Sequence, residues 1–326
     1  NGSYNLVEDV AGVGAARYGF ATGGPDSTDH HIIFRRVVGR FDFSPSSQPK
    51  ATFNAYGTNS GWGVHHVVYQ NCIAIDGQRG PDTGERHYGA WYFPKNMDNA
   101  YIVGSIALNN AVAYSGMFVQ ELQGRGTQVI NSVSWGNTGG SGIRWNGTGS
   151  MLADTVTVGA HPAGALTNSG GAATVSDSLF LNGPVYQTND GGPLTYTNNV
   201  TTASLLHIVS SPVAQGAHIT RRVGVSGTLW GETGWDQETT EPLWPFPYET
   251  EIKAVFSEPN TPASGNTPSS NNTTRGFAAP GTDQWGQPIT LTRYIWQYLG
   301  NQIPTSVYGT GRSLAAPTGV SVTPVP

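Results

Sequence analysis

Residues 129–135, Val-Ile-Asn-Ser-Val-Ser-Trp, carry the pattern that decides the fold of this 326-residue chain. A five-residue segment with an apolar residue at each end, and most often Asn or Asp in the middle, recurs along the sequence. The clear copies are 34–38, 69–73, 102–106, 129–133, 152–156, 175–179 and 196–200. Weaker copies end at Val10 and Val223, and the last position of the segment recurs in steps of 21 to 35 residues. Repetition at such a period indicates a solenoid, in which each copy belongs to one turn of the chain.

The segments predict short strands with one buried face. Another apolar residue follows two positions after the segment, as at Ile75 and Trp135, and this alternation is the period of a strand. The polar middle position points inward if the strand is flat, but lies at a corner if the chain bends there. We favour the corner, because an unpaired amide in the core is costly and Asn tolerates the left-handed conformation. The expected ladder of stacked polar side chains is Asn71, Asn131, Asp154, Asp177 and Asn198.

A second short strand occurs in most intervals, and Gly often precedes it, as a tight corner requires. Examples are 17–20, 116–119, 142–145, 164–167 and 184–187. Two or three short strands per turn, with no helical segment between them, predict an all-β parallel solenoid.

This pattern resembles the right-handed parallel β-helix superfamily, which includes pectate lyases and many secreted or surface proteins. The resemblance covers residues 1–231 and implies about nine rungs with parallel sheets along a cylinder. Residues 232–312, with LWPFP at 243–247 and TRYIWQYLGNQIP at 292–304, resemble the irregular C-terminal cap of secreted β-helix proteins. An apolar stripe predicts one short helix in that cap, at 291–299. Residues 313–326 are expected to form an extended tail or the start of a linker, and resemble the entry strand of a fibronectin type III domain.

The composition is consistent with an extracellular β protein. Charged residues make up 11% of the chain, against about 25% in an average domain. With 16 basic and 21 acidic residues, the chain lacks the basic footprint of a nucleic-acid-binding protein. No apolar run is long enough to span a membrane. A single cysteine, Cys72, excludes a disulfide scaffold within the chain. We therefore expect an extracellular or cell-surface location.

Charged residues gather in one predicted loop, 77–87. It holds Arg79, Asp82, Glu85, Arg86 and His87. A polysaccharide lyase needs a base near carboxylates, which bind Ca²⁺ or another neutralising cation, and this loop has those residue types. A glycoside hydrolase would need two facing carboxylates. The alternative is a loop that is charged only because it is solvated, and no complete catalytic motif is present. We expect no required cofactor, with Ca²⁺ the candidate if the protein is a lyase.

Two histidine pairs lie at matching positions of neighbouring turns. His30 and His31 precede Val38 by the spacing at which His65 and His66 precede Ile73, so the pairs are expected about 5 Å apart. Four imidazoles in one place are candidate ligands for Zn²⁺ or Cu²⁺. A stack of turns with alternate imidazoles in solvent is the alternative interpretation, and the one we favour.

The second strand predicts an outward column of Phe118, Arg144, Leu166 and Tyr186, which Trp91 and Tyr92 would extend. Aromatic side chains beside an arginine suit sugar rings or another protein surface. A loop covering the column is an equal alternative.

The function expected from these features is structural or adhesive, with no enzymatic activity. No cap precedes the first predicted strand, which leaves three explanations: missing upstream sequence, a frayed first rung, or end-to-end docking of subunits. We expect a homo-oligomer or filament, with a polysaccharide as a further candidate partner. The alternative function is a secreted polysaccharide lyase or glycoside hydrolase acting on an acidic glycan.

Overall fold

A computed structural model describes residues 2–202 with gaps, together with 278–282 and 288–290. The gaps are 9, 14–16, 25–26, 36, 41–49, 59–60, 62, 76, 78–87, 109, 111–114, 121–123, 131, 136, 138–140, 149, 154–155, 159–165, 169, 177, 182–185, 189–193 and 198. Among the described residues, the regular structure is entirely β, and no helix is long and apolar enough to cross a membrane. The tail at 313–326 and the repeat copy ending at Val223 lie outside these ranges, as does most of the expected cap, including its helix.

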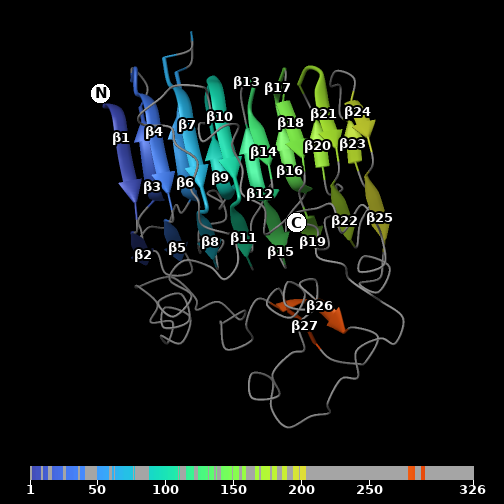
Figure 1. Ribbon diagram of the computed structural model, residues 1–326. Helices are drawn as coiled ribbons and strands as arrows, with labels where there is room; N and C mark the ends of the chain where they lie inside the picture. Colours follow the sequence, from blue (N-terminus) through green and yellow to red (C-terminus); the bar gives the residue numbers. More distant parts are fainter. Residues whose placement is uncertain are drawn as a thin grey trace, which may run out of the picture.

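Three sheets of parallel strands form the main body (Figure 1). Sheet A contains β1 (Ser3–Glu8), β4 (His30–Arg35), β7 (His65–Gln70), β10 (Met97–Val103), β14 (Gln128–Ile130), β18 (Ser150–Ala153), β21 (Ala173–Ser176) and β24 (Leu194–Thr197), with β13 (Gly124–Arg125) and β17 (Gly147–Thr148) beside them. Sheet B contains β2 (Ala11–Val13), β5 (Val38–Arg40), β8 (Ile73–Ile75), β11 (Ile106–Leu108), β15 (Val133–Trp135), β19 (Val156–Val158), β22 (Leu179–Leu181) and β25 (Val200–Thr202). Sheet C contains β3 (Tyr18–Gly23), β6 (Ala51–Tyr56), β9 (Gly89–Phe93), β12 (Ser115–Gln120), β16 (Ser141–Trp145), β20 (Leu166–Asn168) and β23 (Tyr186–Thr188).

The chain visits the sheets in a repeating order, so each circuit adds one strand to each sheet. This all-β arrangement is compatible with a parallel β-solenoid. A separate antiparallel pair, β26 (Ala278–Thr282) and β27 (Pro288–Thr290), lies within the stretch expected to be a cap.

Sheet B confirms the register of the repeat. The positions predicted as equivalent pair with one another: Val38, Ile73, Ile106, Val133, Val156, Leu179 and Val200. The first copy was placed one residue too early, because Ala11 pairs with Val38. The carbonyl of Val10 instead accepts the hydrogen bond from the Val38 amide.

Aromatic side chains from sheets A and C fill the interior. Phe20, Phe53 and Trp91 stack across adjacent strands of sheet C, with ring centroids 5.5 and 5.0 Å apart. Phe34 and Tyr69 form a parallel stack in sheet A, at 5.0 Å. Such pairs contribute about 0.5–1.5 kcal/mol each beyond the burial of their area.

Small residues in sheet B make room for these rings. A Cβ atom on Gly12 would lie 2.8 Å from the Phe20 ring, and one on Gly39 would collide with the Thr52 methyl group. Ala74 and Ala107 continue the same position and are fully buried. Glycine in the first two strands is thus required by the close approach of sheet C.

Small polar side chains form a column where sheet A turns into sheet B, and they make hydrogen bonds to buried backbone amides and carbonyls. The Ser105 hydroxyl lies 3.1 Å from the carbonyl oxygens of Tyr69 and Val103, and it accepts a bond from the Cys72 amide at 3.1 Å. The Ser132 hydroxyl makes the equivalent contact one rung later, where it accepts a hydrogen bond from the Ser105 amide at 3.2 Å. Each hydroxyl therefore joins two rungs through the backbone.

An asparagine ladder lies after sheet B. The side-chain oxygen of Asn137 accepts bonds from the amide and the side-chain nitrogen of Asn110, at 2.7 and 2.8 Å. The Asn110 oxygen in turn accepts a bond from the Gly77 amide at 2.7 Å. Both asparagines are fully buried, so these bonds offset their desolvation.

The ladder expected in the middle position of the repeat is only partly described. Asn71 has a positive φ of 52° directly after β7, which fits the predicted corner. Its side-chain nitrogen has no hydrogen-bond partner in the described part of the chain. Asn131, Asp154, Asp177 and Asn198 lie outside the described residues. The side-chain ladders that the structure does show fall at other positions of the repeat.

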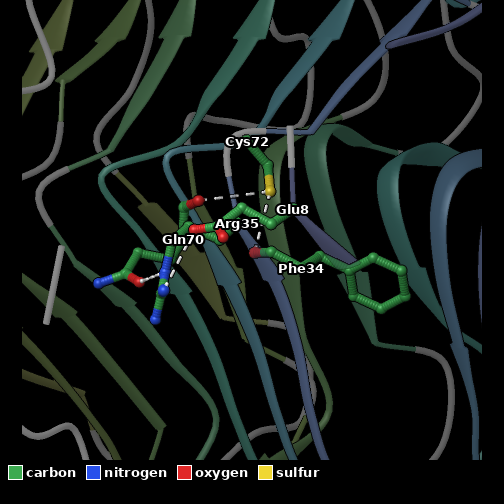
Figure 2. A network of polar contacts seen from close by, with 5 residues as sticks. All are labelled: Glu8, Phe34, Arg35, Gln70 and Cys72. Carbon is green, nitrogen blue, oxygen red and sulfur yellow. Dashed lines mark hydrogen bonds and ion pairs between the residues drawn. The ribbon is translucent and has the colours of Figure 1, made fainter. Parts of the chain in front are cut away.

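Cys72 occupies the position in its rung that Ser105 occupies in the next. Figure 2 shows Cys72 beside a second polar network. Its thiol donates to the carbonyl of Phe34 at 3.3 Å, in the way that the serine hydroxyls do. In the neighbouring network, Arg35 bonds Gln70 at 2.9 Å and Glu8 at 3.2 Å, and so joins three strands of sheet A. Burial raises the pKa of the Cys72 thiol to about 12, so it is a neutral packing group.

We predict that Cys72→Ser folds normally and removes part of the alkaline sensitivity of the protein. The pKa of Cys72 in the folded protein lies above its ordinary value of 9.0. The neutral thiol therefore contributes fully to the free energy of unfolding below pH 9, and this contribution is lost as the pH rises from 9 toward 12. Urea unfolding at pH 8 and pH 10.5 measures this loss, with a limit of about 1.4 kcal/mol per pH unit for one group. Equal losses in the wild type and the variant would contradict the assignment.

Candidate functional site

The two histidine pairs form the cluster of titratable groups that the structure places as the sequence predicts. His30 pairs with His65 in the register between β4 and β7, which puts His31 beside His66. His31 is buried, whereas His30, His65 and His66 are half-buried. The cluster lies at the start of both strands in sheet A.

A left-handed backbone conformation brings each pair of consecutive imidazoles together. Neighbouring side chains in a regular strand point to opposite faces. His31 and His66 instead have φ values of 57° and 53°, which break the alternation. The Nδ1 atoms of His30 and His31 therefore lie 2.8 Å apart, and those of His65 and His66 lie 2.7 Å apart.

The pairs also stack across the strands. The rings of His30 and His65 are parallel at 5.0 Å, and those of His31 and His66 at 4.7 Å. Tyr4 of β1 stacks on His31 at 4.7 Å and covers that side of the cluster. The spacing of these rings follows the spacing of the strands.

Asp98 continues the column on β10, directly opposite His65, and bonds Arg125 at 2.6 Å. Burial lowers the pKa of His65, and the neighbouring His30 and His31 lower it further, against the opposing effect of Asp98. The column thus places one carboxylate beside imidazoles that repel one another when protonated.

Asp29 is a residue that sequence reasoning missed. Its carboxylate accepts bonds from the amides of Gly2 at 2.6 Å and Gly23 at 2.9 Å, just before the histidines. Burial alone would raise its pKa, but these donors, with Ser27 and Thr22, hold the pKa below its ordinary value. An isolated Asp before a strand gives no signal in the sequence, because its partners come from two other segments.

One ring nitrogen from each of His31, His65 and His66 can be chosen so that all three lie within 4.8 Å of one another. Imidazole nitrogens are common ligands of zinc and copper. Among the described residues, this cluster is therefore the candidate holder of a metal ion. The loop residues Arg79, Asp82, Glu85, Arg86 and His87 lie outside the described part of the chain.

The predicted outward aromatic column is wrong. Its register slips at β12, where the pairing with β16 is irregular between Ser115 and Phe118. Phe118 pairs with Trp91 and Ile143, and all three side chains are fully buried in the core. The position of Arg144 is instead beside Val119.

The remaining members keep one backbone column, because Phe118 and Leu166 both pair with Ile143, but that column does not face outward. Leu166 is buried, and Tyr186 pairs with it in the backbone register. Tyr92 is 5% exposed and stacks on Tyr88 at 4.6 Å. Trp91, Phe118 and Leu166 therefore offer no surface to a sugar or a partner.

Comparison with known proteins returned no matching family model, no matching curated protein and no matching solved structure.

We predict that the left-handed conformation at His66 decides which substitutions are tolerated there. His66→Asn should keep the stability of the fold, because Asn99 occupies the equivalent position of the next strand with a φ of 49°. His66→Val should lower the free energy of unfolding by about 1–2 kcal/mol, since a β-branched residue is strained at positive φ. Chemical denaturation of both variants at pH 8 tests this, and equal stability would contradict it.

Proposed function

We propose that this protein is a structural or adhesive β-solenoid of the cell surface or extracellular space. The proposal includes a right-handed coil of about nine rungs, an irregular C-terminal cap, and self-association through the first strand. It rests on one observation: the edge of sheet A at β1 exposes apolar side chains whose equivalents on the next strands are buried.

Leu6 is the clearest exposed apolar side chain at this edge. It is 49% exposed, whereas Ile33 and Val68, which follow it in the same column, are 1% and 0% exposed. Tyr4 and Val10 are 61% and 39% exposed in the same part of the molecule. A further parallel strand placed on β1 would bury Leu6 as β4 and β7 bury each other.

The edge also lacks the usual protection against pairing. Natural edge strands carry Lys or Pro to prevent association. The sequence of β1, SYNLVE, contains neither, and its single charge, Glu8, is bonded to Arg35 within the sheet. A second copy of this chain is the occupant we propose, because it supplies strands with the same spacing and register. Head-to-tail pairing of copies produces a filament, and pairing of two β1 strands produces a closed dimer.

Among the residues that the structure describes, no geometric feature favours the alternative of a polysaccharide lyase or glycoside hydrolase. Its candidate residues in the loop at 77–87 lie outside the described structure.

We predict that Leu6→Lys weakens self-association at least tenfold. The charge would lie in the middle of the pairing edge, at a position exposed enough for the monomer to fold normally. Light scattering after size exclusion, over 1–100 μM protein, measures the association, and negative-stain microscopy distinguishes filaments from dimers. Thr174→Lys is the matched control, because Thr174 is exposed on the interior strand β21 and should leave association unchanged. Wild-type protein that stays monomeric at every concentration would overturn the proposal.

A further inference from the structure

We infer that His31, His65 and His66 form a binding site for one divalent transition-metal ion of the zinc and copper class, with His30 as the neighbouring fourth imidazole. The inference is independent of self-association through β1. It rests on the convergence of ring nitrogens from two strands and on the backbone that holds them there.

The distances within the cluster are close to those that a metal needs. Zinc binds imidazole nitrogen at about 2.0–2.1 Å, so two nitrogens on a tetrahedral ion lie about 3.3 Å apart. The Nδ1 atoms of His65 and His66 are 2.7 Å apart, at hydrogen-bonding distance. A metal would replace the shared proton and widen this pair by roughly half an ångström.

The third nitrogen comes from the adjacent strand. The set of His31, His65 and His66 spans at most 4.8 Å, which is the spacing of neighbouring strands. An ion midway between nitrogens at that separation lies about 2.4 Å from each, so small rotations of the rings complete the contacts.

The backbone conformation holds the three histidines near one another before a metal ion binds. Positive φ values at His31 and His66 turn consecutive imidazoles to the same side on both strands. The register between β4 and β7 fixes the separation of the two pairs. Tyr4 stacks over His31 and closes the side toward β1.

The ligand set selects the ion. Nitrogen donors suit zinc and copper, whereas calcium and magnesium require oxygen donors. Asp98 lies in the same column as His65, but its carboxylate is paired with Arg125 at 2.6 Å. The site would thus bind a dication without a direct carboxylate ligand.

The test is calorimetric titration of the untagged full-length chain with Zn²⁺ and, separately, with Cu²⁺ at pH 7.5. The expected result is one ion per chain. The double variant His31→Asn/His66→Asn should weaken binding at least tenfold, because Asn keeps the left-handed conformation but removes two imidazoles. Thr174→Asn, which replaces an exposed residue of the distant strand β21, is the control and should bind as the wild type does.

Electron paramagnetic resonance of the Cu²⁺ complex provides a readout that does not depend on the variants. The expected spectrum shows hyperfine coupling to at least two imidazole nitrogens, and His65→Gln should reduce that coupling. Circular dichroism checks that each variant retains its β-structure. Absence of binding to the wild type, undiminished binding to the double variant, or coupling unchanged in His65→Gln would overturn the inference.

Discussion

Parallel, in-register stacking of strands is the constraint on which the rest of this structure depends. Because each circuit of the chain adds one strand to each sheet, a residue lies against its equivalent about 4.8 Å away. Residues at the same position of the repeat therefore form a column across the sheet. Where one residue type recurs in a column, its side chains interact with copies of themselves. Aromatic rings stack, as Phe34 does on Tyr69, while serine and asparagine pass hydrogen bonds from rung to rung.

The same constraint explains the low charge of the chain. A column of like charges would repel itself along its whole length, so ionic groups occur where signs or hydrogen-bonding types alternate. Glu8, Arg35 and Gln70 follow this rule on successive strands of sheet A, as do Asp98 and Arg125. The histidine column is the exception, because imidazoles stack favourably only while they are neutral. The cluster is singled out as a site by its geometry, because nitrogens of three of its imidazoles lie within 4.8 Å of one another.

The sequence predicted the sheets better than the corners. Alternation of apolar residues placed Val38 to Val200 correctly, because a buried face with a period of two tolerates no slip of register. It failed at Val10, because Ala11 is the residue that pairs with Val38, and at β12, where the irregular pairing sets Phe118 opposite Ile143 and not Arg144. The serine and asparagine ladders were missed because the search followed apolar alternation and the middle position of the repeat, and these residues lie at other positions. Aligning the repeats at every offset would nevertheless have placed Ser105 under Cys72 and Asn137 under Asn110.

The histidine cluster shows most clearly that the sequence predicts strand register but not local backbone conformation. Equal spacing from Val38 and Ile73 predicted that the pairs would lie on adjacent strands, and the structure places them so. The sequence contained no sign that consecutive imidazoles would touch, because that contact depends on positive φ at His31 and His66. The local backbone conformation at His31 and His66, and not the strand register, therefore brings the ring nitrogens of consecutive histidines together.

Cross-linking across two strands tests the stacking register most directly. Thr174 and Thr195 are exposed and paired between β21 and β24, so cysteines at both positions in a Cys72→Ser background should form a disulfide on mild oxidation. Cysteines at Thr174 and Thr197 would be separated by two residues of slip, about 8 Å between Cα atoms, and should remain reduced. Intact mass spectrometry after alkylation of the free thiols under non-reducing conditions distinguishes the linked from the reduced protein. Efficient linkage of the slipped pair, with none in the paired one, would contradict the register on which this account depends.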